Sequence, residues 1–173
     1  MSEAATFLRD VPKDVPPAVG PAPGGTSHPI PQPAAALGYL GALPIVVLAV
    51  AAWLGDAGLK SFAIGTEIML GALLLVFIGG VRWGLAMAAA PGPGFASLAV
   101  SVVPALLVWG VLTVEDRAIQ LGILIAAFLA LLVSDLRLTA RGGAPAWYPG
   151  LRVPLTVLVV GALGASLAAL LIR

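Results

Sequence analysis

Five long apolar stretches dominate this chain of 173 residues and constrain its fold more than any other feature. A helix that crosses the hydrocarbon core of a bilayer needs about 20 mostly apolar residues. Every backbone polar group in lipid must also be paired within the protein, and these stretches lack the alternation of a transmembrane β-barrel. The sequence predicts an all-α integral membrane bundle of about five transmembrane helices. The predicted spans are roughly Ala34–Leu54, Phe62–Met87, Ala96–Val114, Ala118–Leu136 and Leu151–Ile172.

Composition supports lipid as the solvent of the chain. Hydrophobic residues make up 60% and charged residues only 10%, against about 25% charged residues in an average soluble domain. A soluble fold of this size has too much surface to hide so many apolar side chains. The net charge of +1 indicates no nucleic-acid partner, because such binding relies on a strongly basic surface. The partner that composition predicts is the lipid bilayer.

The first 33 residues differ from the rest and are predicted to be a disordered Pro-rich tail ahead of a transmembrane domain at 34–173. Proline fixes φ and removes a backbone donor, so a Pro-rich stretch resists both helix and sheet. No continuous apolar run is present here, which argues against a secretory signal. The tail holds eight of the fifteen prolines: Pro12, Pro16, Pro17, Pro21, Pro23, Pro29, Pro31 and Pro33.

Chemistry-bearing residues are few. The chain has no cysteine and one histidine, His28 in the tail, so we expect no metal site. Nothing resembles a phosphate-binding loop, a nucleophile elbow or a zincin helix. The sequence therefore predicts no catalytic, metal-binding or cofactor-binding residues, no cofactor and no enzymatic activity.

Basic residues predict the orientation, because cytoplasmic loops are enriched in Lys and Arg. The two sides of the predicted bundle carry six and three basic residues, which puts the N-terminus in the cytoplasm. The first side holds Arg9, Lys13, Arg82, Arg137, Arg141 and Arg152, and the second holds Lys60, Arg117 and Arg173.

Three charged residues within the predicted spans stand out, Glu67, Arg82 and Asp135, because charges there are costly and tend to be paired or functional. Arg82 and Asp135 lie at the same end of the second and fourth spans, so we predict an ion pair between them, with Arg137 and Arg152 as rival partners for Asp135. The pair is either a structural link or part of a ligand site. Glu67 lies on the same inward-facing side of the second span as Arg82. Arg82 follows it by fifteen residues, or about 22 Å of helix, so the two side chains cannot touch.

Glu67 leaves two interpretations open. Either Lys60 or Arg117 reaches it from the loops and the contact is structural, or it is a protonatable acid. Two prolines, Pro44 and Pro104, interrupt the first and third spans. Each frees one backbone carbonyl, as at some transporter sites, although plain packing kinks have the same signature. Ser101 is expected to satisfy a freed group near Pro104.

Small residues form ridges on two predicted helices. Gly80 and Gly84 form a G-x-x-x-G pair on the second span, and Gly161 with Ala165 and Gly164 with Ala168 form similar ridges on the fifth. Close helix approach favours such residues. The ridges predict packing within the chain or, alternatively, a homodimer seam.

Four short segments resemble a family known as domain of unknown function 3429, which includes the transmembrane protein 69 of animals. They are Leu37–Pro44, Ile78–Gly84 (IGGVRWG), Ser101–Pro104 with Trp109, and Pro145–Tyr148 followed by Leu151 and Arg152. The resemblance covers roughly residues 34 to 172. It implies a multi-pass protein of a bacterial inner membrane or, in eukaryotes, of the mitochondrial inner membrane, and it implies no known activity. The shared pattern comprises Pro44, Arg82, Trp83, Pro104, Asp135, Trp147, Tyr148 and Arg152.

Most of these shared residues lie at the predicted cytoplasmic face, which makes that face the candidate site. The candidate cluster is Arg82, Trp83, Asp135, Trp147, Tyr148 and Arg152, with Glu67, Pro44 and Pro104 as secondary candidates. Two functions fit the sequence. One is a structural, accessory or assembly component of a larger membrane complex. The other is a small transporter or ligand-binding protein with a site between the second, third and fourth helices.

Overall fold

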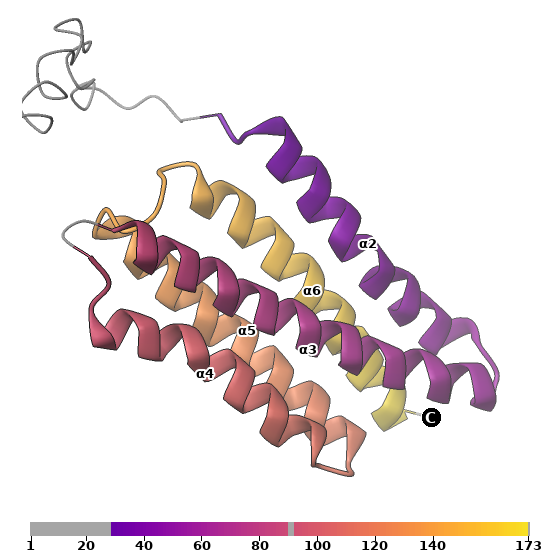
Figure 1. Ribbon diagram of the computed structural model, residues 1–173. Helices are drawn as coiled ribbons and strands as arrows, with labels where there is room; N and C mark the ends of the chain where they lie inside the picture. The colour runs from indigo at the N-terminus through magenta and orange to yellow at the C-terminus, as the bar shows by residue number, and fades with distance from the viewer. Residues whose placement is uncertain (1–28, 90–91, 173) are drawn as a thin grey trace, which may run out of the picture.

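The computed structural model describes residues 29–89 and 92–172, and all the regular elements within these ranges are helices (Figure 1). His28, the tail prolines before Pro29, Arg9, Lys13 and Arg173 lie outside the described residues. All five helices are long and apolar enough to cross a membrane, so the prediction of a five-helix membrane bundle is confirmed. The helices are α2 (Gln32–Leu54), α3 (Ala57–Ala88), α4 (Phe95–Leu112), α5 (Arg117–Ala140) and α6 (Tyr148–Ile172).

Two of the acidic turns between the helices act as helix caps. Asp56 precedes α3 and accepts a hydrogen bond from the backbone N–H of Leu59 at 2.8 Å. Asp116 precedes α5 and accepts from Ala118 at 2.8 Å and Ile119 at 3.0 Å. A side-chain acceptor at this position satisfies backbone donors that the first helical turn leaves unpaired. These residues therefore set where the two helices begin.

The last connection is shorter than the sequence predicts. We expected a break over 137–150, but α5 continues to Ala140 and α6 already begins at Tyr148. Arg137 lies in the last turn of α5, where a basic side chain interacts favourably with the helix dipole. The earlier start of α6 puts a third proline, Pro154, inside a helix in addition to Pro44 and Pro104.

Helix α3 forms the centre of the bundle and packs against each of the other four helices. Helix α2 covers the groove between α3 and α6, and α4 covers the groove between α3 and α5 (Figure 1). The C-terminal end of α6 lies at the same end of the bundle as the turn between α2 and α3 (Figure 1). Among the described residues, α2 contacts neither α4 nor α5. Glu67, on this central helix, is consequently fully buried.

Glycine allows one close helix approach in this bundle. A Cβ built on Gly79 would lie 2.8 Å from the backbone oxygen of Ser101 and 3.3 Å from the ring of Pro104. Any larger side chain at position 79 would therefore separate α3 from α4. Pro104 is buried at this crossing, and a kinked α4 packed on a bare α3 backbone is a sufficient role for it.

The predicted small-residue ridges lie elsewhere. A Cβ on any of the four ridge glycines, Gly80, Gly84, Gly161 or Gly164, would meet nothing within 4 Å. The expectation that the ridges pack within the chain is therefore wrong for Gly80 and Gly84, whereas Gly161 and Ala165 face α2, where Nε1 of Trp53 donates to the Ala165 carbonyl at 2.8 Å. Packing inside α3 uses Gly71 and Gly79, which lie on the opposite, buried side of the helix.

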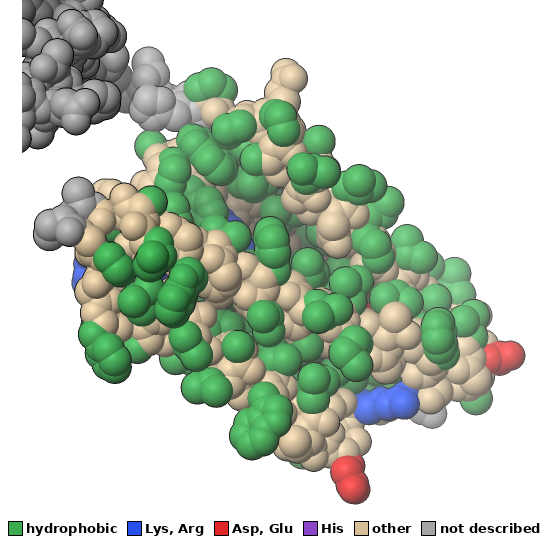
Figure 2. Space-filling view, viewed as in Figure 1, with side chains coloured by type: hydrophobic (Ala, Val, Ile, Leu, Met, Phe, Trp, Pro, Cys, Tyr) green, Lys and Arg blue, Asp and Glu red, His purple; other side chains and the backbone are tan. Residues whose placement is uncertain are grey.

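The outer surface of the bundle is apolar over almost its whole length. Figure 2 shows hydrophobic side chains spread over the visible face, with acidic side chains confined to its lower right end. Phe95 is 90% exposed, Leu54 is 82% exposed and Trp109 is 74% exposed. Soluble monomers rarely expose apolar surface so extensively. The chain is therefore a multi-pass membrane protein.

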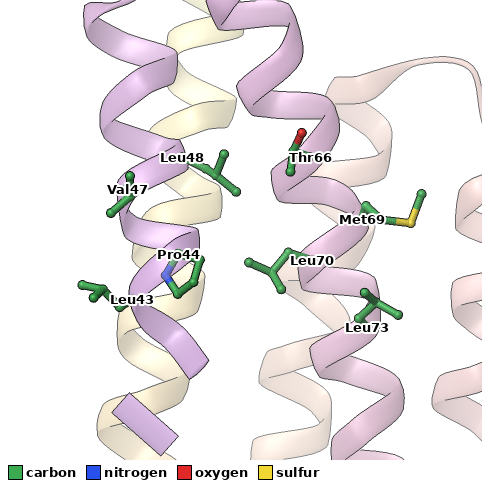
Figure 3. Close-up of a pocket in the computed structure, with 8 residues that line it drawn as sticks. All are labelled: Leu43, Pro44, Val47, Leu48, Thr66, Met69, Leu70 and Leu73. Atoms are coloured by element: carbon green, nitrogen blue, oxygen red, sulfur yellow. The ribbon is translucent and has the colours of Figure 1, made fainter. Parts of the chain in front are cut away.

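Pro44 lines a pocket, and the hydroxyls of Thr66 and Ser101 each donate within their own helix. Pro44 is exposed and lines a shallow apolar pocket of about 590 Å³ between α2 and α3 (Figure 3). The polar group lining this pocket, the hydroxyl of Thr66, already donates to the Phe62 carbonyl of its own helix at 2.9 Å. Ser101 donates to the Ser97 carbonyl at 2.9 Å. Pro104 frees the carbonyl of Val100, and we expected Ser101 to donate to a freed group of this kind. Because its hydroxyl donates to Ser97 instead, that expectation is wrong.

Candidate functional site

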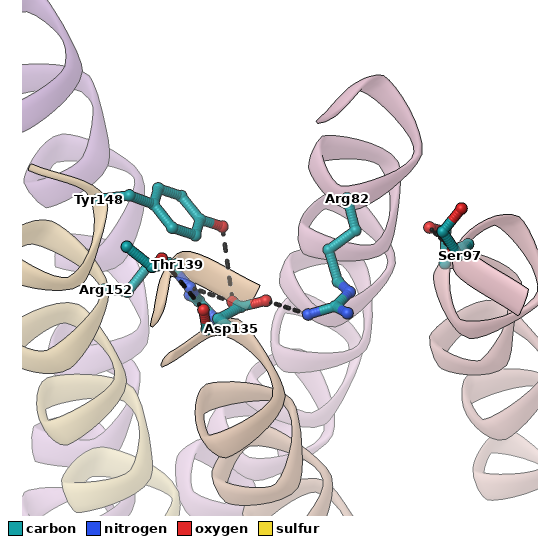
Figure 4. Close-up of polar contacts among 7 residues, drawn as sticks. Arg82, Ser97, Asp135, Thr139, Tyr148 and Arg152 are labelled. Atoms are coloured by element: carbon teal, nitrogen blue, oxygen red, sulfur yellow. Dashed lines mark hydrogen bonds and ion pairs between the residues drawn. The ribbon is translucent and has the colours of Figure 1, made fainter. Parts of the chain in front are cut away.

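Asp135 is the centre of a buried charged cluster that joins three helices at one end of the bundle. Its Oδ1 accepts from Nη1 of Arg82 on α3 at 2.5 Å, and its Oδ2 accepts from Nε of Arg152 on α6 at 2.8 Å. The two guanidinium groups reach the carboxylate from opposite sides (Figure 4). The predicted Arg82–Asp135 ion pair is confirmed. Arg152 is a second partner of the same carboxylate, while Arg137 is exposed to the outside.

Burial makes the cluster electrostatically demanding. The side chains of Arg82 and Arg152 are 9% and 8% exposed, and that of Asp135 is 1% exposed. Two cations and one anion leave the cluster with a net charge of +1. Charges removed from solvent are tolerated when they are paired and hydrogen-bonded. One positive charge therefore remains without a counter-ion among the described residues.

Several donors around the cluster also lack partners. Nε of Arg82 and Nη2 of Arg152 are buried and have no hydrogen-bond acceptor among the described residues. The hydroxyl of Tyr148 makes a long contact of 3.5 Å to Oδ2 of Asp135. A buried donor without an acceptor costs about 1–3 kcal/mol. The cluster thus has donor capacity that no described residue satisfies.

The two tryptophans of the candidate cluster have different positions. Trp147 is half-buried, and its ring meets the edge of Tyr148 with centroids 6.1 Å apart and an interplanar angle of 77°. Trp83 follows Arg82 in sequence but is 43% exposed on the outer surface of α3. Neighbouring residues of a helix point in different directions. Five of the six predicted residues therefore come together, and Trp83 does not join them.

A cavity of about 540 Å³ lies beside the cluster, between α2, α3 and α6. Its walls are largely apolar, and Trp147, Tyr148, Arg152 and Thr156 supply polar groups. Figure 2 shows a hollow between α2 and α3 with basic side-chain atoms at its floor. Small-molecule sites in proteins have this volume and this mixture of apolar walls with a few polar groups.

The cavity does not lie where the sequence predicts a site, and that site stays a prediction, since a smaller apolar pocket of about 280 Å³ does lie between α3, α4 and α5. We expected a site between the second, third and fourth helices, which are α3, α4 and α5. The cavity instead uses α2 and α6, and Arg152 rather than Arg82 lines it. The structural reason is that α2 does not contact α4 or α5 and lies over the groove between α3 and α6. Run lengths and hydropathy carry no information about which groove the first helix covers.

Sequence reasoning missed Thr156, whose hydroxyl is buried, lines the cavity and has no partner among the described residues. It follows Arg152 by four residues, so both side chains lie on one face of α6. A lone hydroxyl four residues from a buried Arg was the signal available. Gly41 of α2 was also missed as a lining residue, and a Cβ there would meet nothing within 4 Å.

Glu67 lies away from this cluster, deep within α3. Its side chain is 0% exposed, and neither carboxyl oxygen has a hydrogen-bond partner among the described residues. The expected contacts with Lys60 and Arg117 are absent, because Lys60 donates to the Ala169 carbonyl at 2.6 Å and Arg117 to the Ser61 carbonyl at 2.7 Å. Glu67 and Arg82 do both face the inside of the bundle, as the sequence predicts.

Comparison with known proteins gives a family without an assigned activity. A family model described as "Protein of unknown function (DUF3429)" matches residues 30–168. The chain is 34% identical over 140 residues to Transmembrane protein 69 of Xenopus tropicalis, an alignment that covers 79% of this chain and 54% of the relative. The chain thus spans about half the length of the curated relative it matches. No solved structure matches the chain.

Proposed function

Because the chain belongs to the DUF3429 family of proteins of unknown function, we propose a function from its own geometry: it binds a small amphiphile with one anionic group in the cavity between α2, α3 and α6. One observation carries this proposal. An apolar cavity of about 540 Å³ is lined by Arg152, a residue of a buried cluster with a net charge of +1. Binding rather than catalysis is proposed, since the cavity presents a cation and hydroxyls.

The chemistry of the lining residues defines the ligand class. The carboxylate or phosphate of the ligand would neutralise the unpaired charge and accept hydrogen bonds from the free Nη2 of Arg152 and the hydroxyl of Thr156. Arg binds planar oxyanions well because its donors form a rigid fork. The apolar body would lie along α2, against Leu37 and the bare backbone at Gly41. The ligand is either a lipid of the bilayer or a free carboxylate.

Tryptophan quenching by a brominated fatty acid tests the site, because bromine quenches an indole that it contacts. Trp147 lines the cavity and Trp109 faces lipid on α4, so two variants that each retain one of these tryptophans form a matched pair. We expect saturable quenching of Trp147 and only gradual, non-saturating quenching of Trp109. A brominated fatty alcohol lacks the anionic group. It should therefore bind the variant that retains Trp147 about tenfold more weakly than the brominated fatty acid does.

Two substitutions separate the cavity from the charge. Gly41→Leu should fill the cavity and abolish saturable quenching of Trp147. The control is Gly110→Leu on α4, where a Cβ also meets nothing within 4 Å, and it should leave the quenching unchanged. Arg152→Gln should weaken binding about tenfold, and Arg137→Gln should have no effect. Mass spectrometry of amphiphiles that co-purify with the protein distinguishes a bilayer lipid from a free acid. Equal, non-saturating quenching of both tryptophans would disprove the proposal.

A second candidate function is an accessory or assembly component of a membrane complex, or a homodimer. The observation that favours it is the open space around Gly80 and Gly84 on α3. Such ridges allow another transmembrane helix to approach closely. Purification in mild detergent at native expression level tests it. A single species of monomer mass without a partner would count against this function.

We further propose that the protein resides in a bacterial cytoplasmic membrane or a mitochondrial inner membrane, with its N-terminus on the cytoplasmic or matrix side. The six-to-three count of basic residues supports this orientation, although Arg82 and Arg152 of that count lie buried with Asp135. The chain lacks cysteine, so single cysteines report on topology directly. A membrane-impermeant maleimide should label Glu115→Cys from outside and Ala146→Cys only after permeabilisation. The reverse pattern would invert the topology.

A further inference from the structure

Glu67 and Ser166 form an isolated polar pair inside the bundle, remote from the charged cluster. Glu67 lies ten residues after the start of α3, about 15 Å along the helix. Ser166 projects from α6 beside the carboxyl group. Both side chains are 0% exposed, and neither has a hydrogen bond of normal geometry to any described residue. Their polar atoms therefore face each other within apolar surroundings.

The charged groups of the neighbouring helices do not neutralise Glu67. Helices α2 and α4 contain no charged residue. Arg117 of α5 donates to Ser61, Lys60 of α3 donates to Ala169, and Asp135 and Arg152 are at the opposite end of the bundle. An isolated carboxylate in a low-dielectric interior is so costly that the group instead takes up a proton. Burial and the missing cation together make a neutral acid the form that fits this site.

A polar pocket lies about one helical turn from Glu67 along α3. The pocket has a volume of about 430 Å³ and lies at the end of the bundle where α3 begins, between Lys60 and Arg117. Ile64 lines it and precedes Glu67 by three residues, which is about 4.5 Å of helix. Water in the pocket would thus come within about one helical turn of the carboxyl group.

We propose that Glu67 and Ser166 form a proton-binding site that exchanges protons with water through this pocket. In the loaded form the Glu67 carboxylic acid donates its O–H to Oγ of Ser166. On release, the O–H bond of the acid breaks, water accepts the proton, and the Ser166 hydroxyl turns to donate to the carboxylate. Lys60 and Arg117 flank the route and favour the released, anionic form. The inference is independent of ligand binding at the Arg152 cavity.

Carbodiimide labelling of the full protein in liposomes tests this site, because carbodiimides react with the protonated form of a carboxyl group. With dicyclohexylcarbodiimide at neutral pH, we expect peptide mass spectrometry to find label on Glu67 and none on Asp135. Asp135 is the matched control, since it is equally buried but paired with two arginines. Label on Glu67 should fall as the pH rises, and Glu67→Gln should remove it.

Ser166→Ala gives a readout that a purely structural role would not change. Without the hydroxyl that stabilises the carboxylate, labelling of Glu67 should persist to higher pH. Thermal unfolding provides a second measurement in case the reagent does not reach the site. Glu67→Gln keeps a neutral group of the same shape, so it should shift the unfolding midpoint by no more than about 2 °C. The proposal is overturned if Glu67 stays unlabelled and Glu67→Gln lowers the midpoint strongly. It is also overturned if Na⁺ at fixed pH protects Glu67, because the site would then hold a metal cation.

Discussion

Asp135 and Glu67 are two acids buried to the same degree in one bundle, yet their surroundings are opposite. Asp135 receives hydrogen bonds from two arginines on two other helices, whereas Glu67 has no partner beyond the nearby hydroxyl of Ser166. Charge at the first site ties helices together, while the second site has the arrangement of an acid that binds a proton. The difference teaches that burial alone does not define the role of an intramembrane acid. The cations within reach decide it.

Asp135→Asn should produce the largest effect and is the strongest challenge to this comparison. The substitution leaves two guanidinium groups buried side by side without a carboxylate, and breaking a buried pair in this way costs about 3–5 kcal/mol. Thermal unfolding in mild detergent, followed by size-exclusion chromatography, measures the loss. Glu115→Gln, at an exposed acid in the α4–α5 turn, is the matched control and should leave the midpoint unchanged. Equal midpoints for both variants would contradict a structural role for the cluster.

Arg82→Gln and Arg152→Gln should each cost less than Asp135→Asn. Either change leaves one arginine paired with Asp135 and removes the excess positive charge, so we expect a loss of about 1–3 kcal/mol in each case. The same unfolding measurement applies. Because the residues share one network, Asp135→Asn combined with Arg82→Gln should cost less than the sum of the two single losses. Strict additivity would indicate that Asp135 and Arg82 do not interact.

Glu67→Leu should change stability in the opposite direction and raise the free energy of unfolding. Replacing an unpartnered buried carboxyl with an apolar side chain of similar length removes a desolvation cost, so we expect a gain of up to about 1 kcal/mol at neutral pH. The variant also loses the proposed contact with the Ser166 hydroxyl, which opposes this gain and keeps it small. A lower unfolding midpoint for Glu67→Leu would show that Glu67 makes a stabilising contact and would remove the contrast with Asp135.

Tyr148→Phe should have the smallest effect of these substitutions. The phenol contacts Asp135 only at 3.5 Å, and its ring packs against Trp147 with or without the hydroxyl. A loss of about 0.5 kcal/mol is expected. A loss as large as that of Arg152→Gln would mean that the hydroxyl is a full third ligand of the carboxylate. Careful comparison of unfolding midpoints at several detergent concentrations would resolve the difference.

Much of this architecture could be predicted from the sequence, because the length of each apolar stretch determines whether it crosses a bilayer. The Arg82–Asp135 pair was predictable for a related reason: the second and fourth spans cross the membrane in the same direction, so charges near the C-terminal ends of both lie at the same face and can meet. Whether Arg137 or Arg152 also pairs with Asp135 could not be decided from the sequence. Resolving it requires the rotation of α5 and α6 about their axes, which run length does not encode.

The cavity could not be predicted from the sequence. Its walls depend on α2 lying over the groove between α3 and α6, a choice made by packing of apolar side chains that look alike in sequence. The ridge of Gly80 and Gly84 misled for the same reason, since G-x-x-x-G spacing identifies a face of a helix without saying what covers it. Gly79, next to the first ridge glycine, is the position that another helix approaches.

The charged cluster also has a consequence for biogenesis. Arg82 emerges from the ribosome 53 residues before the acid that neutralises it, and Arg152 follows later still. Helix α3 must therefore enter the bilayer with its guanidinium group held near the lipid headgroups, as long basic side chains allow. Only after α5 and α6 have been synthesised can all three side chains meet. Nascent chains that stop before α6 should accordingly remain loosely assembled and exposed to membrane proteases.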